Sequence, residues 1–432
     1  STRSMNMTFD YGKKIEVRYD VDVCVIGGGP AGVAAGVTAA RQGARVLMID
    51  SNGFFGGAAT AALVPAFMRF ANGDVFLSGG IGREIYDACE IEKYGTGIRV
   101  EKLKRIYDNM VIESGCDFLF HTNLIDVVVE NGFVKYAIVS AKSGIYAIKA
   151  KVFVDATGDG DLCAMAGNPY EMGDEDGKCM PATLCSIWVD IDWDNVQKPD
   201  SRELARAFAD GVFTQEDYHL SGMWRTGEHL GGGNIGHCYN VVATDERSLT
   251  QAMVTGRKIL PEFEKYYREY LGGGYANTSV AISGSYLGVR ESRRIVGEYV
   301  LNEEDYVKRA SFDDEIGRYY YPIDIHPDPS KDSYDKFLQE FHGLRYQPGE
   351  SYGIPYRSLV PVKLANVLVG GRCISTDKKM QSSIRVMPGC YITGQACGMA
   401  SVLAANKDGE TRNVNIRELQ DKLRSIGGYL PK

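Results

Sequence analysis

The stretch VCVIGGGPAGVAAGVTAARQGARVLMID occupies residues 23–50 and decides the fold. Apolar residues over 21–26 predict a strand that runs directly into a glycine-rich turn. An alanine-rich helix follows, and Gly43 supplies its stop signal. A second apolar strand over 45–49 ends at Asp50. This order of strand, glycine turn, helix, strand and acidic residue predicts a βαβ unit that binds a dinucleotide.

The glycines of this turn follow the pattern Gly27-x-Gly29-x-x-Gly32, and each has a physical task. Gly27 permits the tight turn, Gly29 lets a pyrophosphate approach the backbone, and Gly32 allows close packing of helix on strand. The alternative is a glycine turn that binds nothing. The flanking strand and helix favour the binding interpretation, because the glycine pattern alone occurs in many loops.

The residues around the glycines complete the predicted nucleotide site. The helix begins at Pro30 and Ala31, where free N–H groups and the helix dipole favour phosphate. Asp50 can accept hydrogen bonds from both ribose hydroxyls, which disfavours a 2′-phosphate. We also count Ser51, which follows Asp50, among the cofactor-binding residues.

A second match to the same glycine pattern lies at residues 231–236. The preceding residues 225–229 are polar, so no apolar strand enters the turn, and no alanine-rich helix leaves it. We expect a loop here. The chain therefore has no second Rossmann unit and no visible NAD(P) domain.

Composition limits the classes of function. The 432 residues suggest two interlocked domains. A net charge of -8 argues against nucleic acid as the main partner. No apolar run is long enough for a membrane span, and no apolar signal core is visible. We expect a cytoplasmic protein, although a removed signal peptide would leave the same sequence.

Ten cysteines are present, and no two of them form a C-x-x-C pair. This spacing argues against zinc ribbons, iron–sulfur clusters and thioredoxin-like centres. No His-x-x-x-His or clustered His/Asp spacing occurs either, so no metal site is expected. Free buried thiols in a reducing compartment are the favoured interpretation.

The rest of the chain fits an α/β protein with a discontinuous main domain. Strand patterns over 124–130, 133–141 and 145–155 are separated by turn signals. Residues 170–360 are less regular, and we place an inserted α+β substrate or cap domain there. Residues 1–169 and 361–432 form the expected Rossmann-like dinucleotide-binding domain, which resumes with a strand over 367–370 and a helix over 389–405.

Three ordered segments carry a resemblance to a known family. They are Val23–Asp50 with the glycine-rich loop after it, the strand end Phe153–Asp161 with its Ala-Thr-Gly, and Asn366–Ala400. The chain resembles the bacterial FAD-dependent oxidoreductase family related to fumarate reductase, heterodisulfide reductase and thiazole-synthesis flavoproteins. The resemblance covers nearly the whole chain. It implies a glutathione-reductase-like FAD-binding domain and FAD as the cofactor.

The resemblance also assigns residues to the cofactor. The loop along the pyrophosphate and ribityl chain would contribute Gly56, Gly57, Ala58 and Thr60. The strand end under the adenosine would contribute Ala156, Thr157, Gly158 and Asp161, while Leu124 matches a strand whose backbone contacts adenine. Asp161 has an alternative role as a cap of the following helix. The segment that closes the flavin site would contribute Gly371, Arg372 and Gly389.

The helix that opens at Pro388 and Gly389 has a physical reason to lie against the flavin. Its free N–H groups would face flavin N1 and O2, where negative charge builds on reduction. The alternative is a simple packing helix. Some relatives attach FAD to a histidine after the second strand, but residues 51–80 contain none, so we expect non-covalent FAD. Cys373 lies near the predicted flavin, and an unmodified thiol is favoured over a thioether.

Three residues are candidates for the chemistry. Arg290 can hold a substrate carboxylate, and the alternative is an ion-paired helix surface near Glu291. His237 follows the second glycine-rich stretch and can exchange a proton near neutral pH, and the alternative is a satisfied structural histidine. Arg385 either faces the flavin or anchors its loop.

The main hypothesis is an FAD-dependent oxidoreductase that exchanges a hydride between flavin N5 and a small polar substrate, such as a carboxylate or a sugar. An external electron acceptor or donor would complete the cycle. The alternatives are a sugar-acting lyase-type enzyme and a non-catalytic FAD-binding protein. Substrate identity, reaction direction and oligomeric state are not readable from the sequence.

Overall fold

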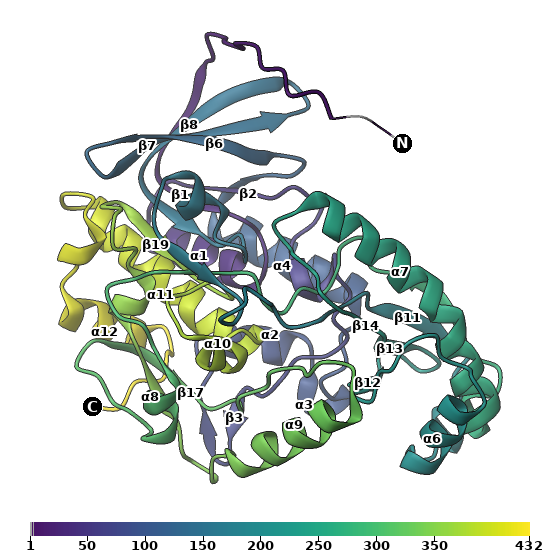
Figure 1. Cartoon of the computed structure of the whole chain (residues 1–432). Coiled ribbons are helices and arrows are strands. Elements are labelled where there is room, and N and C mark those ends of the chain that lie inside the picture. Colours follow the sequence, from purple (N-terminus) through teal and green to yellow (C-terminus); the bar gives the residue numbers. More distant parts are fainter. Residues whose placement is uncertain (1, 3) are drawn as a thin grey trace.

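A computed structural model describes residue 2 and residues 4–432. Its centre is a seven-stranded sheet in the order β5-β2-β1-β8-β7-β6, with β19 paired to β8 in addition (Figure 1). The strands are β1 (Val17–Ile26), β2 (Val46–Ile49), β5 (Asp117–Leu119), β6 (Asn123–Glu130), β7 (Phe133–Ala141), β8 (Gly144–Asp155) and β19 (Val367–Val369). β1 pairs in parallel with β2 and β8, and β2 pairs in parallel with β5. The predicted Rossmann-like α/β fold is confirmed.

The strand β8 divides the sheet into two parts. Its first half pairs antiparallel with β7, and its last residues, 153–155, pair in parallel with β19. More than two hundred residues separate the end of β8 from β19, and β19 then joins the parallel part of the same sheet. This return brings the carboxyl ends of β1, β2, β8 and β19 together, which is where nucleotides bind in such sheets.

Two helices stack closely on this sheet, α1 (Pro30–Arg41) and α11 (Met387–Ala405) (Figure 1). A Cβ on Gly394 of α11 would lie 2.2 Å from the carbonyl oxygen of Ala31, and one on Gly398 would lie 2.3 Å from that of Ala35. The two glycines therefore let the helix backbones touch. The helices α2 (Ile81–Ala88), α3 (Ile91–Tyr94) and α4 (Val100–Ser114) follow the second strand.

A smaller antiparallel sheet has the order β12-β13-β11-β15 and its own apolar core. Its strands are β11 (Ser186–Val189), β12 (Gly222–Arg225), β13 (Gly231–Asn234) and β15 (Ser279–Ser283), and it is covered by α6 (Ser201–Ala209), α7 (Glu246–Lys265) and a π-helix (Tyr266–Leu271). In Figure 1, α7 runs along one side of this region toward α6.

The expectation of a loop at 231–236 was wrong, because Gly231–Asn234 forms the strand β13. The glycines serve packing: a Cβ on Gly233 would lie 2.7 Å from Nε1 of Trp188, and one on Gly232 would lie 2.3 Å from the side chain of Pro65. A strand without side chains fits between these neighbours. The pairing is antiparallel on both edges, so the segment forms no βαβ unit.

The remaining strands and α-helices lie outside these two sheets. They are β3 (Ala71–Asn72), β4 (Val75–Phe76), β9 (Tyr170–Met172), β10 (Ala182–Thr183), β14 (His237–Cys238), β16 (Arg293–Ile295), β17 (Glu315–Tyr319), β18 (Tyr352–Pro355), α5 (Asp161–Met165), α8 (Glu303–Val307), α9 (Lys331–Gly343), α10 (Lys378–Ile384) and α12 (Ile416–Ser425). Buried residues of β17 and β18 pack in the same core as α1 and α11. The domain division at 170 and 360 stays a prediction.

Over the described residues, none of the helices combines the length and the apolar character that crossing a membrane requires.

Candidate functional site

The β1–α1 turn is built around three glycines whose surroundings differ. Gly27 has a φ of 100°, and a Cβ there would lie 2.4 Å from the carbonyl oxygen of Ala156. A Cβ on Gly32 would lie 1.7 Å from the carbonyl oxygen of Gly27. A Cβ on Gly29 meets nothing closer than 3.8 Å, the Cα of Gly57. Gly27 and Gly32 thus serve the turn and its packing, while Gly29 presents open backbone.

The helix α1 begins at this open backbone without a side-chain cap. Gly29 is its N-cap residue, Pro30 and Ala31 open the first turn, and no cap side chain accepts from the first N–H groups. Unpaired N–H groups at a helix start are an anion-binding arrangement. The turn therefore leaves donors available where the sequence predicts a pyrophosphate.

The glycine-rich loop after β2 packs directly on this turn. The Gly56 N–H donates to the Gly28 carbonyl at 2.8 Å, and a Cβ on Gly57 would lie 3.1 Å from the Cα of Gly29. Ala58 lies in the short 3₁₀ turn Gly57–Ala59, and the Thr60 hydroxyl donates to the Phe55 carbonyl at 2.7 Å. The structure thus brings Gly56, Gly57, Ala58 and Thr60 together with Gly27–Gly32.

Asp50 ends β2 and faces the same turn. Its carboxylate accepts from the N–H of Gly28 at 2.8 Å and from the N–H of Asn52 at 2.7 Å. Burial raises the pKa of Asp50 even though these bonds oppose the shift. Ser51 beside it is exposed. The Thr122 N–H donates to the Asp50 carbonyl at 3.1 Å, so the start of β6, which contains Leu124, follows directly from this end of the site.

The end of β8 forms the opposite wall of the turn. The Ala156 N–H donates to the Ile26 carbonyl at 2.9 Å, which holds the Ala-Thr-Gly segment against β1. The Thr157 hydroxyl accepts from the N–H of Asp161 at 2.9 Å. Gly158 has a φ of 77° and lies under the guanidinium of Arg372.

The expected alternative role of Asp161 as a helix cap was wrong. The first N–H groups of α5 are accepted by the side chains of Thr157 and Asp155 instead. The Asp161 carboxylate accepts from Arg293 at 2.9 Å. This leaves Asp161 as a link between the end of β8 and β16.

The third predicted segment closes the site from the side of β19. The Gly371 N–H donates to Thr393 Oγ1 at 3.0 Å, and Arg372 donates to Asp159 and to Ser292, each at 3.1 Å. Gly389 lies in the first turn of α11, where a Cβ would lie 2.6 Å from the Ile384 carbonyl oxygen. The N-cap residue of α11 makes no side-chain hydrogen bond to the helix, so the first N–H groups are also free.

His237 is enclosed between two partners and only 1% exposed. Its Nδ1 lies 2.8 Å from Oδ1 of Asp217, and its Nε2 lies 2.8 Å from Nδ1 of His326. The backbone N–H of His237 donates to the other oxygen of Asp217 at 2.8 Å. Both ring nitrogens have a partner, one in Asp217 and one in His326, so neither nitrogen faces open space.

Arg385 connects the same cluster to the start of α11. It follows α10 directly and donates through Nη2 to the carboxylate and to the carbonyl of Asp324, each at 3.3 Å. The carboxylate of Asp324 also accepts from the Tyr321 hydroxyl at 3.1 Å and lies 3.5 Å from Nε2 of His326. Burial alone would raise the pKa of Asp324, but the neighbouring Arg385 cation holds it below its usual range.

The charge state of the histidines follows from burial. Burial lowers the pKa of His326 well below its usual range, and the Arg290 cation adds to this effect. Burial likewise lowers the pKa of His219 to about 4. The His219 ring is therefore neutral at neutral pH, with one proton on one of its two nitrogens.

Arg290 is a buried cation with neutral partners. Its Nη1 donates to the Pro181 carbonyl and to Thr183, each at 2.9 Å, and its Nη2 donates to Asn234 at 3.0 Å. In the part of the chain that the structure describes, no carboxylate lies within ion-pair distance of it. Burial, with Arg385 nearby, lowers the pKa of Arg290 to about 10, which leaves it charged.

The expected alternative for Arg290, an ion-paired helix surface, was wrong because its segment is a buried loop that leads into β16. It is Arg294 that pairs with Glu291, at 3.1 Å, and Glu291 also accepts from Lys378.

A cavity of about 260 Å³ lies beside this cluster. His326 and Pro181 are in its wall, so the cavity meets one histidine directly and Arg290 through the Pro181 carbonyl. The lining carries charges of both signs, including the ion pair of Lys178 and Asp328 at 2.6 Å. The apolar part of the wall comes from Met180, Ile325, Pro327 and Phe337.

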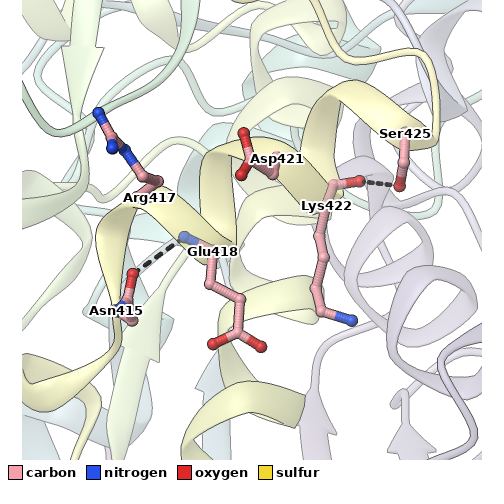
Figure 2. A pocket seen from close by; sticks show the side chains of 6 residues that line it. All are labelled: Asn415, Arg417, Glu418, Asp421, Lys422 and Ser425. Carbon is pink, nitrogen blue, oxygen red and sulfur yellow. Dashed lines mark hydrogen bonds between the residues drawn. The ribbon is translucent and has the colours of Figure 1, made fainter.

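A second hollow lies on the surface of α12 and is separate from all predicted site residues (Figure 2). Asn415, Arg417, Glu418, Asp421, Lys422 and Ser425 line it. The Glu418 N–H donates to Asn415 at 3.0 Å as an ordinary helix cap, and the Ser425 hydroxyl donates to the Lys422 carbonyl at 2.6 Å. These contacts stabilise the helix and build no site.

The structure gathers the three candidates Arg290, Arg385 and His237 into one buried cluster. Sequence reasoning missed four members: Asp217, His219, Asp324 and His326. Asp217 and His219 lie in an irregular stretch, and Asp324 and His326 follow a run of three tyrosines. The only local signal was the Asp-x-His spacing, which occurs at both places and is common without function.

A family model described as FAD dependent oxidoreductase matches residues 22–423. The chain is 26% identical over 156 residues to mitochondrial dihydrolipoyl dehydrogenase of Schizosaccharomyces pombe, a match that spans 34% of this chain and 30% of that protein. It is 26% identical over 234 residues to thiamine thiazole synthase of Methanococcus aeolicus, which spans 49% of this chain and 81% of that protein.

Solved structures with similar folds are distant in sequence. A geranylgeranyl bacteriochlorophyll reductase-like protein from Thermoplasma acidophilum is 13% identical, with 95% of this chain and 84% of that chain covered and a TM-score of 0.46. A flavin-dependent brominase is 13% identical, with 93% and 83% covered and a TM-score of 0.48. The fold assignment rests on the strand order described above.

Proposed function

Since the chain belongs to the FAD dependent oxidoreductase family, we propose that it exchanges a hydride between flavin N5 and a small polar substrate, such as a carboxylate or a sugar. The observation that carries the substrate part of this proposal is Arg290. Its guanidinium is only 7% exposed and has neutral hydrogen-bond partners, and one of these, Pro181, lines a cavity of about 260 Å³.

FAD is the cofactor of this chain, and the residues at the turn fit it. The open backbone at Gly29 and the uncapped start of α1 suit a pyrophosphate, and Asp50 suits the ribose. The uncapped start of α11 suits the electron-rich edge of the flavin. Bound FAD supplies the hydride chemistry at N5, and the chain supplies orientation and charge.

Arg290 would bind the negative or polar end of the substrate. A buried cation is stabilised most by an anion, because neutral acceptors replace its hydration only in part. A guanidinium can hold a carboxylate through two parallel hydrogen bonds. The neutral partners Pro181, Thr183 and Asn234 fix the guanidinium plane in advance. These contacts favour a carboxylate over a neutral sugar.

His237 and Arg385 would act as positioning residues. His237 contacts His326 and Asp217, so it would influence a substrate through the His326 ring at the cavity wall. Arg385 would fix the position of Asp324 relative to the start of α11, because it donates to Asp324 and lies just before that helix. Residues 170–360 would form the substrate side of the site.

The electron partner would be external, because the chain has one βαβ dinucleotide unit and the second glycine pattern is a strand. Ten free thiols, nine of them buried, support a reducing compartment such as the cytoplasm.

The test is an anaerobic screen of hydroxy acids, unsaturated acids and sugars, with flavin absorbance as the readout. A substrate bleaches the flavin of the FAD-loaded protein. Arg290→Gln should then raise KM for an acid substrate by roughly 10-fold or more with unchanged FAD content. Arg83→Gln, on an exposed arginine of α2, is the matched control and should leave KM unchanged. Equal KM values for Arg290→Gln and wild type would remove Arg290 from substrate binding.

A further inference from the structure

Three potential metal ligands converge at the inner end of the histidine cluster. One ligand atom each from His219, Asp324 and His326 lies within 4.8 Å of the other two. Two histidines and one carboxylate on one side of an ion are the ligand set of open, oxygen-reactive or Lewis-acid sites for divalent first-row transition metals. Atoms that share such an ion at about 2.1 Å lie roughly 3.0–3.4 Å apart. Small side-chain rotations would therefore close the site.

The hydrogen-bond chain behind His326 fixes the ring that faces the site. Asp217 is acceptor-only as a carboxylate, so it takes the Nδ1 proton of His237 at 2.8 Å. A metal ion on Nε2 of His326 would leave the proton of that ring on Nδ1, from which it can be donated to Nε2 of His237, also at 2.8 Å. A ligand histidine commonly donates its second nitrogen to a carboxylate or another acceptor in this way.

Nε2 of His326 faces a carboxylate oxygen, Oδ2 of Asp324, at 3.5 Å, which is long for a hydrogen bond between them. A cation between the two atoms would be bound by the imidazole nitrogen and the carboxylate together. The distance lies just above the roughly 3.0–3.4 Å that separates two ligand atoms on one metal ion.

His219 supplies the third nitrogen. Its ring packs against His326, with centroids 4.4 Å apart, and against Phe337, with centroids 4.6 Å apart. Over the described residues, neither ring nitrogen of His219 makes a hydrogen bond. The ring is thus positioned by packing with its nitrogens unused, as a ligand would be.

Asp324 is held by two donors to the same oxygen that faces His326. Tyr321 and Arg385 both donate to Oδ2, so the carboxylate has a fixed orientation. The charge of Arg385, together with that of Arg290, weakens the site for a bare dication and favours an anionic group as a further ligand. The metal would therefore bind best with an anion completing its coordination.

We propose that His219, Asp324 and His326 bind one divalent first-row transition metal ion, with His237 and Asp217 fixing the tautomer of His326. This revises the expectation of no metal site, because the ligands come from two segments far apart in the sequence. The proposal does not depend on the redox reaction, since binding is measured without turnover.

The test is equilibrium dialysis of the FAD-loaded, chelator-treated protein against Co²⁺, with bound cobalt counted by elemental mass spectrometry. Wild type should bind about one Co²⁺ per chain. Asp324→Asn and His219→Gln should each weaken binding by at least about tenfold, and His237→Gln, behind the ligand, by about 10- to 100-fold. His342→Gln, an exposed histidine on α9, should bind as wild type does.

FAD content and thermal midpoint identify variants that have lost their fold. Among the ligand substitutions, His219→Gln should disturb folding least, because the His219 ring is only partly buried. Retention of one tight Co²⁺ in both Asp324→Asn and His219→Gln would overturn the proposal, as would the absence of stoichiometric binding by wild type. A failed substrate screen with intact Co²⁺ binding would count against the proposed reaction alone.

Discussion

Two glycines of the β1–α1 turn have different tasks, which alanine substitutions separate. Gly32→Ala places a Cβ 1.7 Å from the Gly27 carbonyl oxygen, so the turn must shift, at a cost of roughly 1–3 kcal/mol of folding stability or more. We expect a lower thermal midpoint of the cofactor-free protein and little bound FAD. Circular dichroism and the flavin-to-protein absorbance ratio measure the two effects.

Gly29→Ala is the matched partner of that experiment. Its Cβ meets only the Cα of Gly57, at 3.8 Å, so the cofactor-free fold should keep its thermal midpoint. The methyl group would occupy the space through which a pyrophosphate approaches the backbone, so FAD affinity should fall by roughly 10-fold or more. Wild-type FAD affinity in Gly29→Ala would show that the phosphates lie elsewhere.

At the scale of elements, the contact of α1 with α11 depends on glycine. Gly394→Ala gains roughly 1 kcal/mol of helix propensity but places a Cβ 2.2 Å from the Ala31 carbonyl oxygen. We expect a net loss of about 1–3 kcal/mol, measured as a lower thermal midpoint of the FAD-loaded protein.

Gly36→Ala on α1 is the control for that substitution. Its Cβ approaches only the flexible end of Met48, at 3.0 Å, and the sulfur of Cys116, at 3.4 Å. The gain in helix propensity should offset this contact and leave the midpoint near that of wild type. Equal midpoints for Gly394→Ala and Gly36→Ala would contradict the close contact between the two helices.

The elements that local patterns define were predictable. The strand Phe133–Ala141 has the predicted bounds, because an Asn-Gly turn precedes it and a Ser-Gly turn follows its end. The segment Gly231–Asn234 was not predictable as a strand, since its glycines have no strand propensity. Tertiary packing against Trp188 and Pro65 decides its conformation.

The residues of the candidate site also fall into a predictable group and an unpredictable group. The residues around Gly27–Gly32 follow one another in sequence with a known mechanism, so their positions were predictable. His326 and His219 each carry only the common Asp-x-His spacing, and a loop after β17 and a loop before β12 bring them together only in the folded chain. Arg290 and His237 were predictable as candidates. For His237 the structure shows the alternative of a satisfied histidine, whereas the burial of Arg290 among neutral partners had no local signal.

At the scale of the whole molecule, burial determines how readily the cysteine thiols react. Nine of the ten cysteines are buried and Cys89 is partly buried, and burial raises the pKa of the Cys89 thiol to about 11. We expect at most one thiol to react quickly with a disulfide reagent at neutral pH, and all ten after unfolding in guanidinium chloride. Fast reaction of several thiols in the native protein would contradict this packing.

One bound flavin per chain is the central claim about the whole molecule. The direct measurement is the absorption spectrum of the protein after incubation with FAD and removal of free cofactor by gel filtration. We predict a flavin spectrum with about one FAD per chain, fully released into solution by acid denaturation. A protein that keeps its fold and retains no flavin would contradict this claim.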